Sequence, residues 1–157
     1  MRTMLLVEDD RPTALAYEAL LSVGYPDVAV EIVWSAEAAL LRLAHSRYDV
    51  IVSDFKLPGL DGLGLLVASY CLHSRTPFIL VSAYGDRALE ESAARLGAYA
   101  VLHKPIASDT LLDVVDRALT QGRAAVHQGK NTDRPAGTSA MRLEKRPEAD
   151  VESKNLE

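Results

Sequence analysis

The fold is decided by residues 48–62, which read YDVIVSDFKLPGLDG. Residues 48–53 contain a short apolar run, which predicts a buried strand that stops at Asp54. A turn containing Pro58, Gly59 and Gly62 follows this strand, and an apolar pattern of helical period comes after it. Strand, turn and helix thus succeed one another within one short segment, which is typical of a parallel sheet with crossover helices.

The same succession recurs on both sides of this stretch. The predicted strands are residues 4–7, 28–34, 48–53, 77–82 and 100–102. The predicted helices place these apolar residues on their inner faces: Leu15, Ala19, Leu20 and Val23 before a stop at Gly24; Ala39, Leu40, Leu43 and Ala44 after a cap at Ser35; Leu65, Leu66 and Tyr70; residues 87–96 before Gly97; Leu111, Leu112, Val115 and Leu119 after a cap at Ser108.

Five strands that alternate with five helices predict an α/β fold whose parallel sheet is covered on both faces. Right-handed crossovers make it an open doubly wound sheet. Two strand orders are common for such sheets, and both bind ligands beyond the carboxyl ends of the strands. We expect the flavodoxin-like order 2-1-3-4-5, with five helices.

Charge and composition divide the chain into two parts. Residues 1–122 hold 10 Lys and Arg and 16 Asp and Glu, whereas residues 123–157 hold 7 and 6. The second part has few large aliphatic residues and cannot bury enough surface to offset the entropy of ordering. We therefore predict one domain over residues 1–122 and a disordered or weakly helical polar tail over residues 123–157.

Several classes of protein are disfavoured by the composition. The formal net charge of −5 disfavours a dedicated nucleic-acid binder, and the tail is too short and polar for a helix-turn-helix. No apolar stretch is long enough to span a membrane, and the N-terminus lacks a secretory signal. A single cysteine, Cys71, allows no internal disulfide and suits a reducing cytosol, so we expect a cytoplasmic protein.

Polar residues follow four of the five predicted strands. Glu8 and Asp9 follow the first, Asp54 follows the third, Ser82 ends the fourth and Lys104 follows the fifth. In the expected order these residues share one edge of the sheet, where three carboxylates without a cation would repel one another. A hard divalent ion is expected there. Mg²⁺ fits best, because it accepts a few carboxylates, and a lysine and a hydroxyl can hold phosphoryl oxygens.

Each of these residues also has an ordinary structural explanation. Acids between a strand and a helix are often N-caps, which is our interpretation of Asp10 before Arg11-Pro12. Taken singly, Asp54 is a loop acid before a Pro-Gly turn, Ser82 a strand-end hydroxyl and Lys104 a solvated cation. Their joint occurrence after the correct strands favours a phosphoryl site, where a carboxylate can act as nucleophile and form an acyl phosphate.

The chain resembles the receiver domain of bacterial two-component response regulators over residues 3–121. The resemblance rests on residues 5–10 (LLVEDD), 54–62 (DFKLPGLDG), 81–83 (VSA) and 104–105 (KP). It implies that Asp54 is the phosphoacceptor, and that Asp9 binds Mg²⁺ directly while Glu8 binds it through water.

Further roles are implied by the same resemblance. Asp54 itself and the backbone carbonyl of Lys56 would be further metal ligands. Ser82 and Lys104 would hold the phosphoryl group, and the bond before Pro105 would be cis. The turn at Asp61 and Gly62 would lead into the third helix.

The chain departs from the family pattern three residues before the lysine, where an aromatic residue is usual and Val101 stands instead. Neither Tyr99 nor Tyr84 occupies the matching position. The aromatic part of an output switch is therefore in question. The large side chains of Lys56 and Tyr84 flank the path of the hydrolytic water in this family, so we hypothesise slow self-dephosphorylation.

The expected function is a stand-alone receiver, phosphorylated on Asp54 by a sensor histidine kinase or a histidine phosphotransfer protein. It would signal to a downstream protein target or pass the phosphoryl group on, with a homodimer through the fourth and fifth helices as one possibility. A receiver-like scaffold that works without phosphorylation is the alternative. We expect no enzyme beyond self-phosphorylation and dephosphorylation, since a phosphohydrolase usually needs an acid where Lys56 stands.

Overall fold

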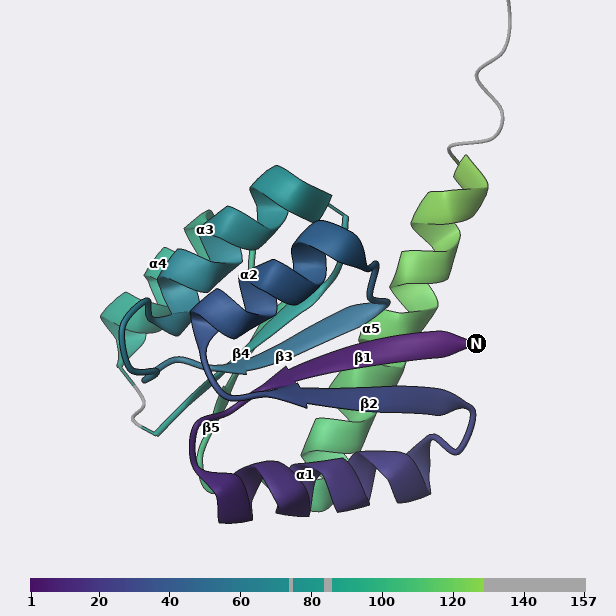
Figure 1. The fold of residues 1–157 in the computed structure, drawn as a ribbon, viewed down its shortest axis with the longest axis horizontal. Coiled ribbons are helices and arrows are strands. Elements are labelled where there is room, and N and C mark those ends of the chain that lie inside the picture. Colours follow the sequence, from purple (N-terminus) through teal and green to yellow (C-terminus); the bar gives the residue numbers. More distant parts are fainter. Residues whose placement is uncertain (74, 84–85, 129–157) are drawn as a thin grey trace, which may run out of the picture.

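The alternating pattern of the sequence becomes five strands and five helices in a computed structural model of the chain, which describes residues 1–73, 75–83 and 86–128 (Figure 1). The strands are β1 (Arg2–Val7), β2 (Val28–Val33), β3 (Val50–Asp54), β4 (Phe78–Ser82) and β5 (Ala100–His103). The helices are α1 (Arg11–Gly24), α2 (Ala36–His45), α3 (Gly62–His73), α4 (Arg87–Arg95) and α5 (Ser108–Gln128).

The strands form one parallel sheet in the order β2-β1-β3-β4-β5. This confirms the predicted flavodoxin-like topology. The register pairs Val7 with Ser53 and Ser82 with His103, so the strands end near one common edge. Continuous apolar runs form the centre of the sheet, where every residue of β3 and β4 is buried.

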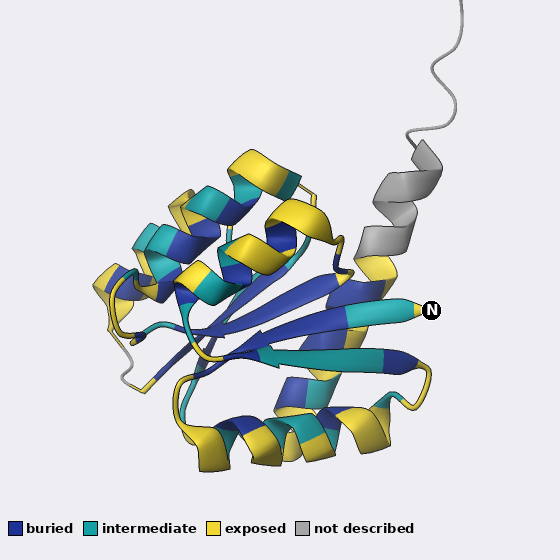
Figure 2. Ribbon diagram, in the orientation of Figure 1, coloured by how far each residue is buried: buried dark blue, intermediate teal, exposed yellow. Residues whose placement is uncertain are grey.

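Each face of the sheet carries its own hydrophobic core, as Figure 2 illustrates by the buried inner sides of the elements. Successive residues of a strand point to opposite faces, so Leu5 and Val7 join the core under α2, α3 and α4, whereas Met4 and Leu6 join the core under α1 and α5. Burial on both faces explains why the strands read as unbroken apolar runs.

The inner face of α1 differs from the predicted one. Leu15 and Val23 were assigned to it, but they are 55% and 84% exposed, whereas Ala14 and Leu21 are fully buried. Apolar residues surround most of this helix, so more than one apolar stripe satisfies a helical period. Contact with the sheet selects the stripe.

The last helix differs from the prediction at its N-terminus. Ser108 lies inside α5 as its first residue, and the Leu111 amide donates to the carbonyl of Ala107, so Ser108 is not the N-cap. The helix runs to Gln128, so its last residues belong to residues 123–157, which we predicted to be a disordered or weakly helical tail. The rest of the predicted tail, residues 129–157, lies outside the described residues. Among the helices described, none has the length and apolarity needed to cross a membrane.

Candidate phosphoryl and metal site

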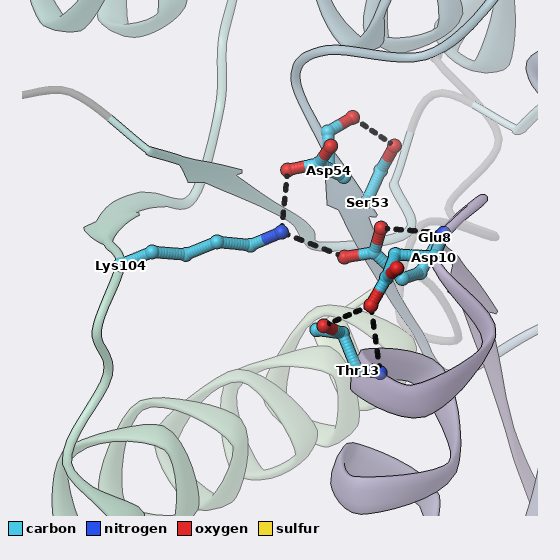
Figure 3. A network of polar contacts seen from close by, with 6 residues as sticks. All are labelled: Glu8, Asp10, Thr13, Ser53, Asp54 and Lys104. Atoms are coloured by element: carbon cyan, nitrogen blue, oxygen red, sulfur yellow. Dashed lines mark hydrogen bonds and ion pairs between the residues drawn. The ribbon is translucent and has the colours of Figure 1, made fainter.

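The carboxyl edge of the sheet gathers the polar residues that the sequence placed after its strands. Glu8 and Asp9 follow β1, Asp54 ends β3, Ser82 ends β4 and Lys104 follows β5. Because β1, β3, β4 and β5 are consecutive neighbours, these side chains come from adjacent strand ends. Figure 3 shows the amine of Lys104 between the carboxylates of Glu8 and Asp54.

The site contains more negative than positive charge. One carboxylate oxygen from each of Glu8, Asp9 and Asp54 lies within 4.8 Å of the others. The Nζ of Lys104 lies 2.8 Å from Glu8 Oε2 and 3.2 Å from Asp54 Oδ1. Asp9 is exposed, but Glu8 and Asp54 are only 2% and 7% exposed. One ammonium thus faces three carboxylates, two of them largely cut off from water, which favours a further cation.

The pKa values of the buried groups reflect this imbalance. Burial raises the pKa of the Glu8 carboxyl, and its hydrogen bond to Lys104 offsets this only in part. Burial likewise raises the pKa of Asp54, against the lowering effect of Lys104. Burial alone would lower the pKa of Lys104, but its hydrogen bond to Glu8 and the charge of Asp54 outweigh burial and raise that pKa. Lys104 therefore stays charged, whereas keeping the Glu8 and Asp54 carboxyl groups ionised in the folded protein costs free energy.

Asp10 caps α1, as the sequence predicted. Its Oδ2 accepts hydrogen bonds from the Thr13 amide at 3.0 Å and the Thr13 hydroxyl at 2.5 Å, and these bonds lower its pKa. The Asp10 amide in turn donates to Glu8 Oε1 at 3.1 Å. The capping turn thereby orients the Glu8 carboxylate, whose other oxygen binds Lys104.

A tight turn between β3 and α3 carries Lys56. The Phe55 carbonyl accepts hydrogen bonds from the amides of Leu57 and Gly62, at 3.1 and 2.8 Å. A Cβ at Gly62 would lie 2.5 Å from the Asp54 carbonyl oxygen, so this position needs glycine. Asp61 caps α3 by accepting from the Gly64 amide at 2.8 Å, which agrees with its predicted place in the turn. The Lys56 side chain is exposed.

On the β5 side, Ser82 and Lys104 are joined through the backbone. The Lys104 amide donates to the Ser82 carbonyl at 2.7 Å, and the Ser82 side chain is buried. The Lys104-Pro105 peptide bond is cis. The structure therefore brings Ser82 and Lys104 to the same strand ends as Asp54.

Val101, the position without an aromatic ring, is partly buried in β5 against the core under α2, α3 and α4. Two residues later, the ring Nε2 of His103 lies 2.5 Å from Glu90 Oε1 on α4. Sequence reasoning missed this link between β5 and α4, because no local pattern pairs residues from different elements. Tyr84, the other predicted lifetime position, lies outside the described residues.

The donor set matches the requirements of Mg²⁺. Oxygen ligands from one or two carboxylates, with several waters retained, are the usual protein contribution to a magnesium site. The acid cluster offers three carboxylates, and Asp9, which is exposed, leaves the cluster open to solvent on its side. The residues present therefore fit the ion that the sequence led us to expect.

This fold and site define a class, the phosphoryl-accepting signal domains built on a doubly wound sheet. The family model of the response regulator receiver domain matches residues 4–116, so the chain belongs to this family. In this family, phosphorylation of an aspartate in an acidic, Mg²⁺-binding pocket is the general switch.

Known proteins of several lengths are similar to the chain. Response regulator protein FleR of Pseudomonas aeruginosa is 40% identical over 144 residues, which cover 89% of this chain but only 29% of FleR. The probable chemotaxis protein CheY of Rhizobium etli is 30% identical over 71% of this chain and 88% of that protein. The chain thus spans less than a third of FleR but most of this CheY.

A solved structure adds a metal to the comparison. The receiver domain of sensor histidine kinase PA1611 from Pseudomonas aeruginosa is 26% identical to the chain, with a TM-score of 0.69. The alignment covers 76% of this chain and 98% of that one, which holds a magnesium ion in its active site cleft.

Proposed function

We propose that this chain is a phosphorylation-switched receiver whose phosphoacceptor is Asp54. The donor would be a phosphohistidine of a sensor histidine kinase or of a histidine phosphotransfer protein. The observation that carries the proposal is the ammonium of Lys104, held 2.8 Å from Glu8 and 3.2 Å from Asp54, the two carboxylates that form an acid cluster with the exposed Asp9. The signal would leave through contacts with a downstream protein or by transfer of the phosphoryl group.

The proposed reaction uses residues already in place. A carboxylate oxygen of Asp54 attacks the phosphorus, a P–O bond forms, and the P–N bond to the donor histidine breaks with its electron pair returning to the imidazole. Lys104 neutralises charge on the phosphoryl oxygens, and Ser82 can hold another of them. Asp9, Glu8, Asp54 and the Lys56 carbonyl would hold Mg²⁺, which when bound supplies charge neutralisation.

The test exposes the protein to a small-molecule phosphodonor with and without Mg²⁺ and measures its mass. We expect a gain of about 80 Da, the mass of one phosphoryl group, that requires Mg²⁺ and is lost in Asp54→Asn. Asp113→Asn is a matched control, since this exposed aspartate on α5 pairs with Arg117 and belongs to neither the acid cluster nor the β3–α3 turn. A gain that persists in Asp54→Asn would disprove the assignment.

A scaffold that binds its partner without phosphorylation is a second candidate, and Val101 favours it. An aliphatic residue there cannot reproduce the two positions of an aromatic ring. Partner affinity measured with and without phosphorylation separates the candidates, because only a switch needs differential binding to two conformations. Equal affinity for both forms would support the scaffold.

The lifetime of the acyl phosphate follows from the same site. We propose that self-dephosphorylation is slow, because the side chains of Lys56 and Tyr84 shield the acyl phosphate from the hydrolytic water. Phosphate release is measured in the wild type, Lys56→Ala and Tyr84→Ala, and both variants should release phosphate faster. Loss within seconds that neither substitution changes would contradict the proposal. Steady turnover of a phosphate ester would instead indicate an enzyme.

The assembly of the phosphorylated form is also open to measurement. We propose that dimers, if they form, use α4 and α5. Sedimentation before and after phosphorylation tests this, and a substitution on an exposed position of α4, such as Arg95→Glu, should weaken the dimer. Binding of nucleic acid is not expected from the acidic domain.

A further inference from the structure

We propose that Glu37, in the first turn of α2, is a positioning residue for the metal site. It would hold the β3–α3 turn, residues 55–61, in the shape in which the Lys56 carbonyl can serve as a ligand. This inference rests on the proposed function, which makes that carbonyl a ligand. Neither the sequence motifs nor the acid cluster includes Glu37.

The contact that carries the inference joins distant parts of the chain. The Leu60 amide donates a hydrogen bond to Glu37 Oε1 at 3.0 Å, across 23 residues of sequence. This bond makes the largest contribution to the lowered pKa of Glu37, so the turn favours the charged carboxylate. In Figure 1, α2 and α3 lie side by side on one face of the sheet, which lets α2 reach this turn.

The backbone of the turn is adapted to the same carboxylate. Gly59 has φ +77°, in the left-handed region that favours glycine. A Cβ at Gly59 would lie 2.7 Å from Glu37 Oε1, so any other residue would also displace the carboxylate. Glu37 Oε1 therefore both accepts the hydrogen bond from the Leu60 amide and lies against Gly59.

The other polar contacts lie within the turn, except that the Phe55 amide at its start donates to the Val81 carbonyl of β4 at 2.7 Å. The Phe55 carbonyl is taken by the Leu57 and Gly62 amides, and Asp61 caps α3. Within the described residues, no hydrogen bond uses the Lys56 carbonyl, which leaves it available to a ligand. The Phe55 bond fixes the start of the turn on β4, and Glu37 is the side chain from another element that holds the residues after Lys56. Losing Glu37 should therefore loosen the segment that presents the carbonyl.

The experiment compares Glu37→Ala with Glu37→Gln. Both remove the negative charge, but glutamine keeps an oxygen that can accept from the Leu60 amide. Glu91→Ala, on the exposed side of α4, controls for the loss of one surface acid. Mg²⁺ affinity is measured by titrating MgCl₂ and following backbone amide resonances, and exchange of the Leu60 amide is measured without metal.

Loss of a residue that orients metal ligands commonly weakens metal binding by about 10- to 100-fold. Glu37 acts through the turn, so we expect Glu37→Ala to weaken Mg²⁺ binding about tenfold and to speed Leu60 amide exchange. Glu37→Gln and Glu91→Ala should stay within about twofold of the wild type. Gly59→Ala should weaken binding more in the wild type than in Glu37→Ala, because the two substitutions disturb one contact.

Three results would overturn the inference. Unchanged Mg²⁺ affinity in Glu37→Ala would show that the tie does not serve the metal. Equal losses in Glu37→Ala and Glu37→Gln would show that charge acts in place of the hydrogen bond. A wild type that binds no Mg²⁺ would overturn the proposed metal site itself, and this inference with it.

Discussion

Replacing Asp54 by asparagine is expected to stabilise the protein in the absence of divalent ions. The Asp54 carboxylate is 7% exposed, and burial raises its pKa despite the ammonium of Lys104 nearby. The fold therefore accommodates a neutral side chain at this position better than a charged one. Asparagine has nearly the same shape and removes the charge. The proposed phosphoacceptor should thus be a residue whose charge, needed for function, lowers the free energy of unfolding.

The magnitude follows from three opposing contributions. Repulsion from Asp9, the carboxylate whose charge raises the pKa of Asp54 and whose ligand oxygen lies within 4.8 Å, is about 3.5 kcal/mol at an effective dielectric of about 20. Attraction to Lys104 at 3.2 Å is about 5 kcal/mol on the same basis. Burying a carboxylate costs several kcal/mol, here about 3 kcal/mol. The balance favours Asp54→Asn by about 1–2 kcal/mol, and Lys104 keeps Glu8 as a partner at 2.8 Å.

The assay is urea unfolding at pH 7, followed by the fluorescence of Trp34, the single tryptophan, with and without Mg²⁺. Mg²⁺ should stabilise the wild type more than Asp54→Asn, since a bound ligand adds stability according to its affinity. A carboxyl with a raised pKa loses its stabilising contribution as the pH rises through that pKa. The difference between the two proteins should therefore close as the pH falls toward 4. An asparagine variant less stable than the metal-free wild type would refute the reasoning.

Three further results are expected. Lys104→Met should destabilise the metal-free protein by about 3 kcal/mol, because it leaves two buried carboxylates without their cation, and Mg²⁺ should restore part of the loss in urea unfolding. The Tyr48 phenol, which donates to Glu31 at 2.6 Å, should ionise near its raised pKa of about 12 in an ultraviolet titration. Its contribution to stability is present below about pH 10 and lost toward pH 12, and Tyr48→Phe should remove this dependence. Gly62→Ala should cost about 2–3 kcal/mol in thermal or urea unfolding, since its Cβ would lie 2.5 Å from the Asp54 carbonyl.

The sequence predicted the sheet and the position of the site because both depend on short-range patterns and one topological rule. Apolar runs bounded by turn residues located each strand to within a few residues. Once the strands were parallel, the rule that their carboxyl ends share an edge was sufficient to bring Glu8, Asp54 and Lys104 together. None of these steps required knowledge of side-chain packing.

The failures occur where packing or distant contacts decide. Leu15 and Val23 are exposed because α1 is apolar on more than one side, and only the sheet selects the buried stripe. The hydrogen bond from Leu60 to Glu37 spans two elements and leaves no periodic signal. In the sequence this contact is marked only by Gly59, which has a positive φ and lies close to Glu37. A search for sequence patterns identifies this glycine only as part of a turn.

The charges of the site also explain why the proposed switch needs a metal. Three carboxylates and one ammonium carry a net charge of −2, which one divalent cation balances. Phosphorylation would exchange the single charge of Asp54 for about two on the phosphoryl group, so the balance would become more negative by about one charge. Lys104 is the cation placed to respond, because it already contacts Asp54 and its amide is bonded to Ser82. A switch built this way depends on the position of Lys104. The residue of β5 that is usually aromatic in this family is Val101 here, so it offers no aromatic side chain that could move with Lys104.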